Sequence, residues 1–179
     1  MTAHLSDLDV KIRAASKDIT AKMESSGGGI LKIEFVDMET EEPGFKKLNI
    51  QFDTCNSMGA NFINSVLEKA AIVLKQWFEF HKLQVAGQDN FEIIMSILTN
   101  YTPQCLVEAY VECPIDQLTE INGLDPVSFA DRFYKAVRIA NVDVSRATTH
   151  NKGRFNGIDA VVIATGNDYR AIEACGHAY

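Results

Sequence analysis

Residues 57–80 read SMGANFINSVLEKAAIVLKQWFEF, and this stretch carries the strongest periodic signal in the chain. Its apolar residues recur at i, i+1, i+4, i+5 and i+8 onward, so they form one broad stripe on a helix of about six turns. They are Phe62, Ile63, Val66, Leu67, Ala70, Val73, Leu74, Trp77 and Phe78. We therefore expect a long amphipathic helix that packs its apolar stripe on the core of an N-terminal domain.

The segments before this helix predict a helix and a β-hairpin. Apolar residues at helical spacing predict a helix over 6–24, which the glycine-rich run 25–29 ends. Strands follow at about 30–38 and 46–54, and the Pro43-Gly44 pair between them favours a turn. The resulting order of elements resembles a split βαβ sandwich that lacks its first strand.

The second half of the chain gives a weaker pattern. We expect buried strands at 91–99 and 105–113 and a buried strand or extended core segment at 159–165. A helix should run from Pro126, capped by Asp125, to about Asn141, and a last helix should open after Gly166. Pro and Gly cluster at 114–126, so we place a domain boundary there, which gives domains 1–113 and 114–179.

The composition excludes several classes of protein. The chain has 179 residues, with 17 Lys and Arg against 24 Asp and Glu, and a formal charge of −7. This acidic balance argues against nucleic acid as a partner. No apolar run is long enough to span a bilayer and the N-terminus lacks a signal-peptide pattern, so we expect a cytoplasmic protein with no membrane partner. The four Cys and four His lack the spacing of metal ligands, so we expect free, buried thiols and no metal site.

The first candidate site joins the second strand to the long helix. The segment Asn56–Asn61 is built of small and polar residues, and the amides of a helix's first turn have no partners inside the helix. The helix dipole adds partial positive charge there, so a phosphate or pyrophosphate could dock. A capped helix whose glycine permits close packing explains the same residues. The glycine patterns of ordinary dinucleotide and P-loop sites are absent.

The second candidate site is the run from Arg146 to Asp168, RATTHNKGRFNGIDAVVIATGND. Two glycine-containing segments that favour turns flank one apolar segment, an arrangement that can bring Lys152 near Asp168. An aspartate keeps a neighbouring lysine charged, and a fixed ammonium stabilises an oxyanion as it forms. A polar loop with a structural ion pair is the alternative.

The segment 149–179, THNKGRFNGIDAVVIATGNDYRAIEACGHAY, closely resembles the core signature of the bacterial class II 3-hydroxy-3-methylglutaryl-coenzyme A (HMG-CoA) reductases. SMGAN at 57–61 is similar to their cofactor signature, SILTNYTPQCLV at 96–107 to a further segment, and SGGG at 26–29 to their glycine run. The segments follow the family's order over nearly the whole chain. The resemblance implies an α+β fold, with a small ferredoxin-like cofactor-binding domain followed by part of a larger α/β catalytic domain.

The resemblance also implies an activity and its residues. The family reduces HMG-CoA to mevalonate, or runs the reverse reaction, with two hydrides from NADH or NADPH and coenzyme A as the other product. Lys152 would stabilise the oxyanion, with Asp168 as its hydrogen-bonding partner, and Arg146 and Asn156 would contact the acyl group. A weaker match places Asp9 near the adenosine ribose. The cofactor site would be lined by Asn56, Met58, Gly59, Ala60, Asn61 and Asn100. The family's active site lies between two subunits, which implies a homodimer.

Two departures from the family pattern keep an alternative open. Asn56 occupies a position that is usually acidic, and the family's catalytic glutamate and C-terminal histidine segments have no counterpart in the sequence. On this basis we expect an internal fragment that is inactive in isolation. The alternatives are a non-catalytic, truncated relative that keeps a nucleotide-binding fold, and an unrelated α+β interaction module.

Overall fold

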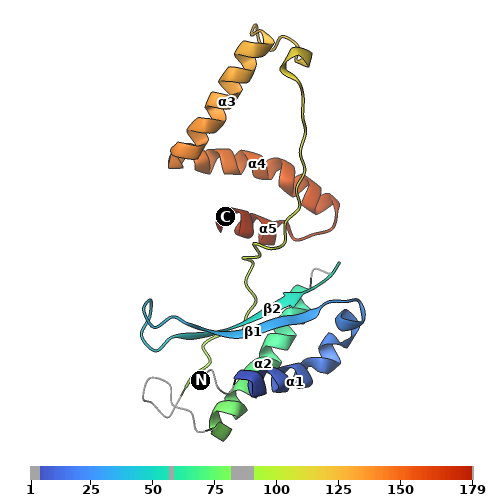
Figure 1. Ribbon diagram of the computed structural model, residues 1–179, viewed down its shortest axis with the longest axis vertical. Helices are drawn as coiled ribbons and strands as arrows, with labels where there is room; N and C mark the ends of the chain where they lie inside the picture. The colour runs from blue at the N-terminus through green and yellow to red at the C-terminus, as the bar shows by residue number, and fades with distance from the viewer. Residues whose placement is uncertain (1–4, 57–58, 82–90, 179) are drawn as a thin grey trace. The chain divides into compact units, whose positions relative to one another are not determined.

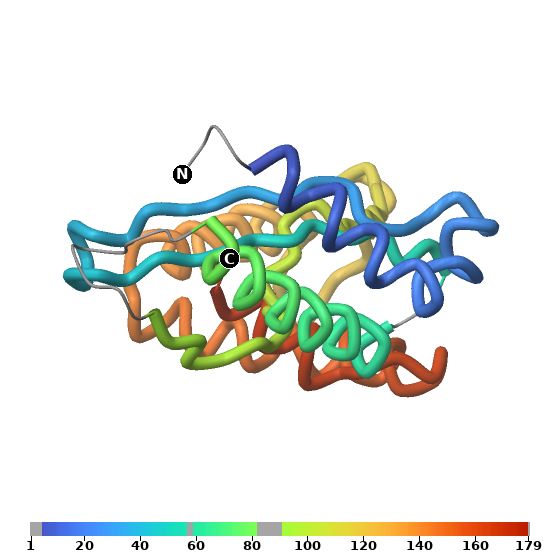
Figure 2. Tube along the Cα trace, turned by 90° about the horizontal axis from the view of Figure 1, so that it is seen from below, coloured from blue at the N-terminus to red at the C-terminus, as the bar shows by residue number. Residues whose placement is uncertain are grey.

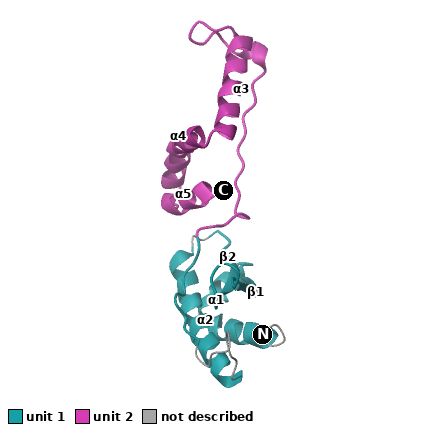
Figure 3. Cartoon of the chain, turned by 90° about the vertical axis from the view of Figure 1, so that its left-hand side faces the viewer, with its two compact units in different colours: residues 1–99 teal, residues 100–179 magenta. Residues whose placement is uncertain are grey.

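The computed structural model describes residues 5–56, 59–81 and 91–178. The chain divides into two compact units, which we call unit 1 (residues 1–99) and unit 2 (residues 100–179; Figure 3). This division lies earlier in the chain than the boundary predicted from the Pro and Gly cluster at 114–126.

Unit 1 contains a two-stranded sheet with two helices on one face. Helix α1 spans Leu5–Ser25, strand β1 Gly29–Asp37, strand β2 Lys46–Asp53 and helix α2 Ala60–His81. The strands are antiparallel, with an irregularity between Ile30 and Lys32. Both helices cover the same side of this sheet (Figures 1 and 2). The four elements predicted from residues 6–80 are therefore confirmed, with small shifts at their ends.

The core of unit 1 lies between the helices and the sheet. Its buried apolar side chains are Leu8, Ile12, Ile30, Ile33, Val66, Ala70, Trp77 and Phe78. Polar contacts join the two helices at the rim of this core. Lys69 of α2 binds the Asp18 carboxylate at 2.8 Å, and the Trp77 indole donates to Asp7 Oδ2 at 2.9 Å. The periodicity of 57–80 thus identified the helix face that builds the core.

The regular elements of unit 2 in its described part are helices, and they follow an irregular segment. The 3-10 turn η2 covers Ile115–Gln117, and α3 (Pro126–Val142), α4 (Val144–Ala164) and α5 (Tyr169–Ala178) follow. The predicted cap of α3 is confirmed, since Asp125 accepts hydrogen bonds from the amides of Val127 and Ser128. Helices α4 and α5 pack through the buried ring of Phe155, which stacks on His177 at 4.8 Å.

Three strand predictions are wrong. Residues 91–99 and 105–113 form no strand, and 159–165 lies almost entirely within α4. A short apolar run does not distinguish a buried strand from a helix, and a strand needs a neighbour for its backbone hydrogen bonds. The described residues hold a sheet of only two strands, so a helix satisfies the backbone of the apolar segment internally.

Two further predictions are corrected. The segment 146–157, which we expected to form turns around the second candidate site, is helical throughout. Its glycines lie inside α4, and packing and intrahelical hydrogen bonds outweigh their low helix propensity. The four cysteines are free, but Cys55, Cys105 and Cys113 are exposed rather than buried.

Candidate functional site

The loop between β2 and α2 is a tight reversal of the chain. The Cys55 amide donates to Asp53 Oδ1 at 2.8 Å, and Cys55 itself has a left-handed backbone with φ of 52°. Gly59, with φ of +64°, precedes the helix, and its carbonyl accepts the first helical hydrogen bond from Ile63 at 2.8 Å. A Cβ at Gly59 would lie 3.0 Å from Thr54 Cγ2, so both the backbone conformation and the space favour glycine.

The start of α2 is suited to an anion. Its first turn contains no acidic residue, and Ala60 and Asn61 are exposed. Free amides and the helix dipole favour negative charge at such an end. Asn56 is exposed in the same loop, whereas Ser57 and Met58 of the predicted cofactor segment lie outside the described residues.

The glycine run packs against this loop, a contact that sequence reasoning missed. The Cys55 thiol donates to the carbonyl of Ser26 at 3.4 Å. A Cβ at Gly28 would lie 2.4 Å from the Asp53 carbonyl and 2.7 Å from Cys55 Sγ. The two segments are therefore held together where only glycine fits. The signal available in the sequence was the glycine run itself, directly before a strand predicted to pair with β2.

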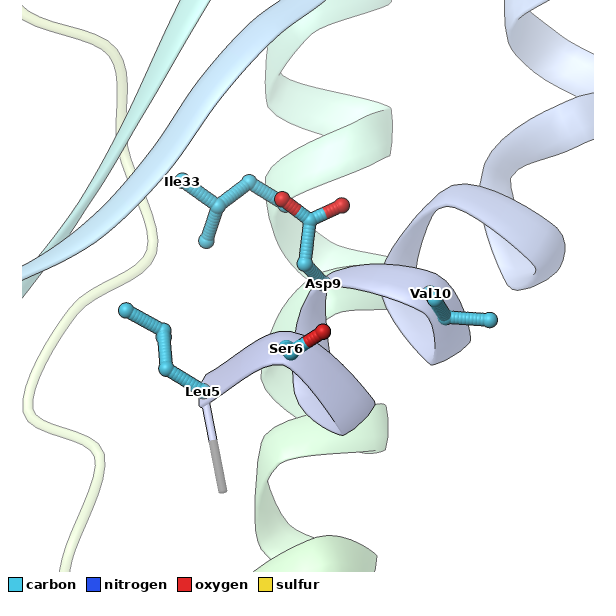
Figure 4. A pocket seen from close by; sticks show the side chains of 5 residues that line it. All are labelled: Leu5, Ser6, Asp9, Val10 and Ile33. Atoms are coloured by element: carbon cyan, nitrogen blue, oxygen red, sulfur yellow. The ribbon is translucent and has the colours of Figure 1, made fainter. Parts of the chain in front are cut away.

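A shallow pocket lies at the start of α1, with a volume of about 460 Å³ (Figure 4). Leu5, Ser6, Asp9 and Val10 line it from the helix, and Ile33 lines it from β1. Asp9 is ion-paired with Arg13 on the next turn, and the Arg13 guanidinium donates to the Ile30 carbonyl at 2.6 Å. The structure therefore places the Asp9 carboxylate beside a cavity, and its proposed role near an adenosine ribose stays a prediction.

The predicted catalytic residues lie on two helices of unit 2. Lys152 and Asn156 are exposed on α4 one turn apart, so they share a helix face, while Arg146 is exposed near the start of this helix. Asp168 lies just before α5, and its Oδ1 accepts from the amides of Arg170 and Ala171 at 3.1 and 3.2 Å. Because the sequence predicted turns here, it gave no sign that Lys152 and Asn156 lie on one face of a helix.

The structure does not join Lys152 to Asp168. Across residues 91–178 no hydrogen bond or ion pair links these two side chains, and the nearest cation to Asp168 is Arg170, 3.9 Å from Oδ1. Asn100 is exposed at the beginning of unit 2. The roles assigned to these residues therefore remain predictions.

The described residues contain no group of three or more His, Cys, Asp or Glu side chains that could hold a metal ion. None of their helices combines the length and the apolar character needed to cross a membrane.

Comparisons with known proteins agree on one family. The profile of the hydroxymethylglutaryl-coenzyme A reductases matches residues 3–179. A probable HMG-CoA reductase of Borreliella burgdorferi is 32% identical over 173 residues, which cover 97% of this chain and 37% of that protein. The HMG-CoA reductase of Archaeoglobus fulgidus is 31% identical over 153 residues, which cover 86% of this chain and 31% of that protein.

A solved structure gives the same result. The HMG-CoA reductase of Streptococcus pneumoniae superposes with a TM-score of 0.63 and 31% identity, over 94% of this chain and 42% of that one. The chain thus spans less than half the length of each of these three proteins.

Proposed function

The chain belongs to the hydroxymethylglutaryl-coenzyme A reductase family, and from this premise we propose that it takes part in the reduction of HMG-CoA to mevalonate, or in the reverse reaction. The observation that carries the proposal is the family match over residues 3–179, together with identities of 31–32% to two reductases. In this proposal, unit 1 binds a nicotinamide cofactor and unit 2 contributes a catalytic lysine.

The reaction needs a fixed positive charge at the carbonyl of the substrate. Two nicotinamide cofactors, bound in turn, would supply the hydrides, the first for the thioester carbon and the second for the aldehyde carbon. Lys152 donates a hydrogen bond to the carbonyl oxygen as negative charge develops on it, both in the thiohemiacetal stage and in the aldehyde stage. When the thiohemiacetal collapses, coenzyme A would leave as the thiolate and take a proton from the histidine that the family supplies on its C-terminal segment.

Neighbouring residues support the lysine in this proposal. Asn156 shares its helix face and would contact the acyl group together with Arg146. Asp168, held by the first amides of α5, would hydrogen-bond the ammonium of Lys152. The structure does not join the two side chains, so this step requires α4 and α5 to be rearranged from their positions here.

The cofactor segment would hold the phosphates of NADH or NADPH at the start of α2. The positive φ of Gly59 and the absence of an acidic residue in the first turn support this role. Asn56, Met58, Ala60, Asn61 and Asn100 would complete the site. We further propose a ferredoxin-like fold for the complete cofactor domain, and a homodimer, as the family resemblance implies.

The test of the chemistry is HMG-CoA-dependent oxidation of the cofactor, followed at 340 nm. The assay uses a polypeptide that joins this chain to the glutamate and histidine segments used by the family. Lys152→Ala should lower turnover by about 10²–10³-fold, because one oxyanion donor is lost. Lys75→Ala, which removes an exposed lysine of α2, is the control and should leave turnover unchanged. Near-normal turnover in Lys152→Ala would refute the catalytic role of this lysine. No turnover by the unaltered polypeptide would favour the non-catalytic nucleotide-binding alternative.

A further inference from the structure

Two cysteines that are far apart in the sequence come close together in unit 2. Cys175 belongs to α5, and its Sγ accepts a hydrogen bond from the Thr102 amide at 3.5 Å. The Thr102 hydroxyl lies 3.7 Å from the same sulfur. Thr102 also begins a tight turn, since the Cys105 amide donates to its carbonyl at 3.0 Å. A single residue, Thr102, is therefore hydrogen-bonded to both cysteines.

The turn limits how far apart the two cysteines can lie. A turn closed by this hydrogen bond keeps the Cα atoms of its first and fourth residues, here Thr102 and Cys105, within about 7 Å. Cys105 thus lies about one turn's width from the atoms that contact Cys175 Sγ. A disulfide needs Cα atoms about 4.4–6.8 Å apart. Because the turn belongs to neither helix nor strand, its backbone can adjust to this requirement.

The other two cysteines have different surroundings. Cys55 belongs to unit 1, where its thiol donates to the Ser26 carbonyl. Cys113 lies later in the irregular segment, which runs away from α5 towards the start of α3 after Cys105 (Figure 1). All four thiols are free in the structure. The contacts of Thr102 therefore single out Cys105 as the partner of Cys175.

We propose that Cys105 and Cys175 form a reversible disulfide when the chain meets a peroxide, and that this bond ties α5 to the turn 102–105. The two thiols differ in exposure, since Cys105 is exposed and Cys175 is half-buried. An accessible thiol beside a second thiol that can resolve it is typical of redox-responsive pairs.

The exposed thiol of Cys105 reacts first. Its sulfur attacks hydrogen peroxide, so that an S–O bond forms, the O–O bond breaks and one water is released. The Cys175 sulfur then attacks the Cys105 sulfenic acid, forming the S–S bond and releasing the oxygen as a second water. Two thiols and one peroxide thus give one disulfide and two waters. A dithiol such as dithiothreitol returns the two electrons and restores both thiols.

The cross-link would act on the proposed catalytic residues. Asp168 is held by the first amides of α5, and Asn100 lies two residues before Thr102. The proposed pairing of Lys152 with Asp168 requires α5 to move from its position here, so a tethered α5 would lower turnover. This consequence rests on the proposed function, whereas formation of the disulfide does not.

The test treats the 179-residue chain with equimolar hydrogen peroxide and maps its disulfides by mass spectrometry of proteolytic peptides. Two of the four thiols should be lost, and the linked peptides should contain Cys105 and Cys175. Dithiothreitol should restore all four thiols. Hydrogen exchange of the α5 amides should slow about tenfold or more in the oxidised chain, because a cross-link restricts local opening.

Serine variants identify the pair. Cys105→Ser and Cys175→Ser should each abolish the linked peptides and the slower exchange of α5. The matched control is Cys113→Ser, which removes an exposed thiol from the same irregular segment and should leave both results unchanged. Far-UV circular dichroism checks that the helices are retained. If Cys175→Ser disturbs α5, Cys105→Ser still decides the result, because its position is exposed.

The outcomes separate the disulfide from its consequence. Four thiols that resist oxidation, a Cys105–Cys113 link, links between chains or a random mixture would overturn the proposed pair. The consequence is tested in the joined polypeptide of the Lys152 assay, with added segments that contain no cysteine. Turnover that ignores the cross-link overturns the consequence alone. A polypeptide without turnover before oxidation contradicts only the proposed function, since the peptide map decides the disulfide.

Discussion

Unit 1 and unit 2 differ in how far their apolar side chains are buried. Unit 1 buries eight apolar residues in one cluster between two helices and a sheet. In unit 2 the buried apolar residues are Ala140 and Phe155, whereas many large apolar side chains of α3, α4 and the segment 105–113 are exposed. Yet unit 2 holds the longest family motif. Regular apolar spacing therefore predicts where a core forms, whereas a family motif shows family membership without predicting how its residues pack.

The largest expected effect tests the core of unit 1. Leu8→Ala should lower the free energy of unfolding by about 3–5 kcal/mol, because a fully buried leucine leaves a cavity. Trp77 is the single tryptophan and is buried in this unit, so its fluorescence during urea unfolding reports on unit 1. Val107→Ala, at a fully exposed position of unit 2, is the control and should change the stability by less than about 0.5 kcal/mol. Equal effects of the two substitutions would contradict the claim that Leu8 belongs to a buried core whereas Val107 is exposed.

A pair of glycine substitutions tests the helices of unit 2. A Cβ at Gly176 would lie 2.4 Å from Phe155 Cζ, so Gly176→Ala should destabilise the packing of α4 on α5 by about 1–3 kcal/mol. A Cβ at Gly153 meets nothing within 4 Å, and Gly153→Ala should stabilise α4 by about 1 kcal/mol. Amide hydrogen exchange of α4 measures both effects. Reduced protection in Gly153→Ala would show that residues 146–157 form turns, as the sequence suggested.

Two buried hydroxyl groups of α1, those of Ser16 and Thr20, differ in their hydrogen bonding. Ser16 is fully buried and its Oγ has no hydrogen-bond partner among the described residues, whereas the Thr20 hydroxyl donates to Glu24 Oε1 at 2.6 Å. Ser16→Ala should stabilise unit 1 by about 1 kcal/mol, because it removes an unsatisfied polar group. Thr20→Ala should destabilise it by a similar amount, because it removes the hydrogen bond to Glu24 and leaves a small cavity at a buried position. Urea midpoints followed by Trp77 fluorescence decide the sign, and a loss of stability in Ser16→Ala would contradict this account.

The smallest expected effect concerns pH. The hydrogen bond from Lys11 lowers the pKa of Asp7 below its ordinary value, partial burial opposes this shift, and hydrogen bonds from Trp77 and His81 lower the pKa further. A carboxyl group whose pKa is lowered by folding contributes stability above its unfolded pKa of about 4, and this stability is lost as pH falls through the folded pKa. Asp7→Asn should therefore be less stable at pH 7 but lose less stability between pH 5 and pH 2. An acid profile identical to that of the unaltered chain would refute the role of Asp7.

The sequence predicted those parts of the fold that depend on local patterns. Three features depend on residues that are close in sequence: the apolar stripe of 57–80, the turn at Pro43-Gly44 and the Asp125 cap. The structure contains all three. The state of 159–165 could not be predicted in this way, because a short apolar run becomes a strand only beside another strand. The contact of Gly28 with the loop after β2 could not be predicted either, because it depends on how β1 and β2 pair.

The two candidate sites differ in the same way, since one depends on local residue types and the other on how whole helices pack. The start of α2 was predicted as a site from its small residues and its place before a helix, and the structure gives Gly59 a positive φ there. The arrangement of Lys152 and Asp168 depends on the packing of whole helices, which residue spacing does not determine.

The most direct test of the account is cofactor binding by the 179-residue chain, measured by isothermal titration with NADH and with NADPH. The account predicts saturable binding of at least one cofactor, weakened about tenfold or more in Gly59→Ala. Gly44→Ala is the matched control, since Gly44 also has a positive φ but lies in the hairpin turn, and this variant should bind as the unaltered chain does. No saturable binding of either cofactor, or equal binding by both variants, would contradict the assignment of the α2 start as the nicotinamide site.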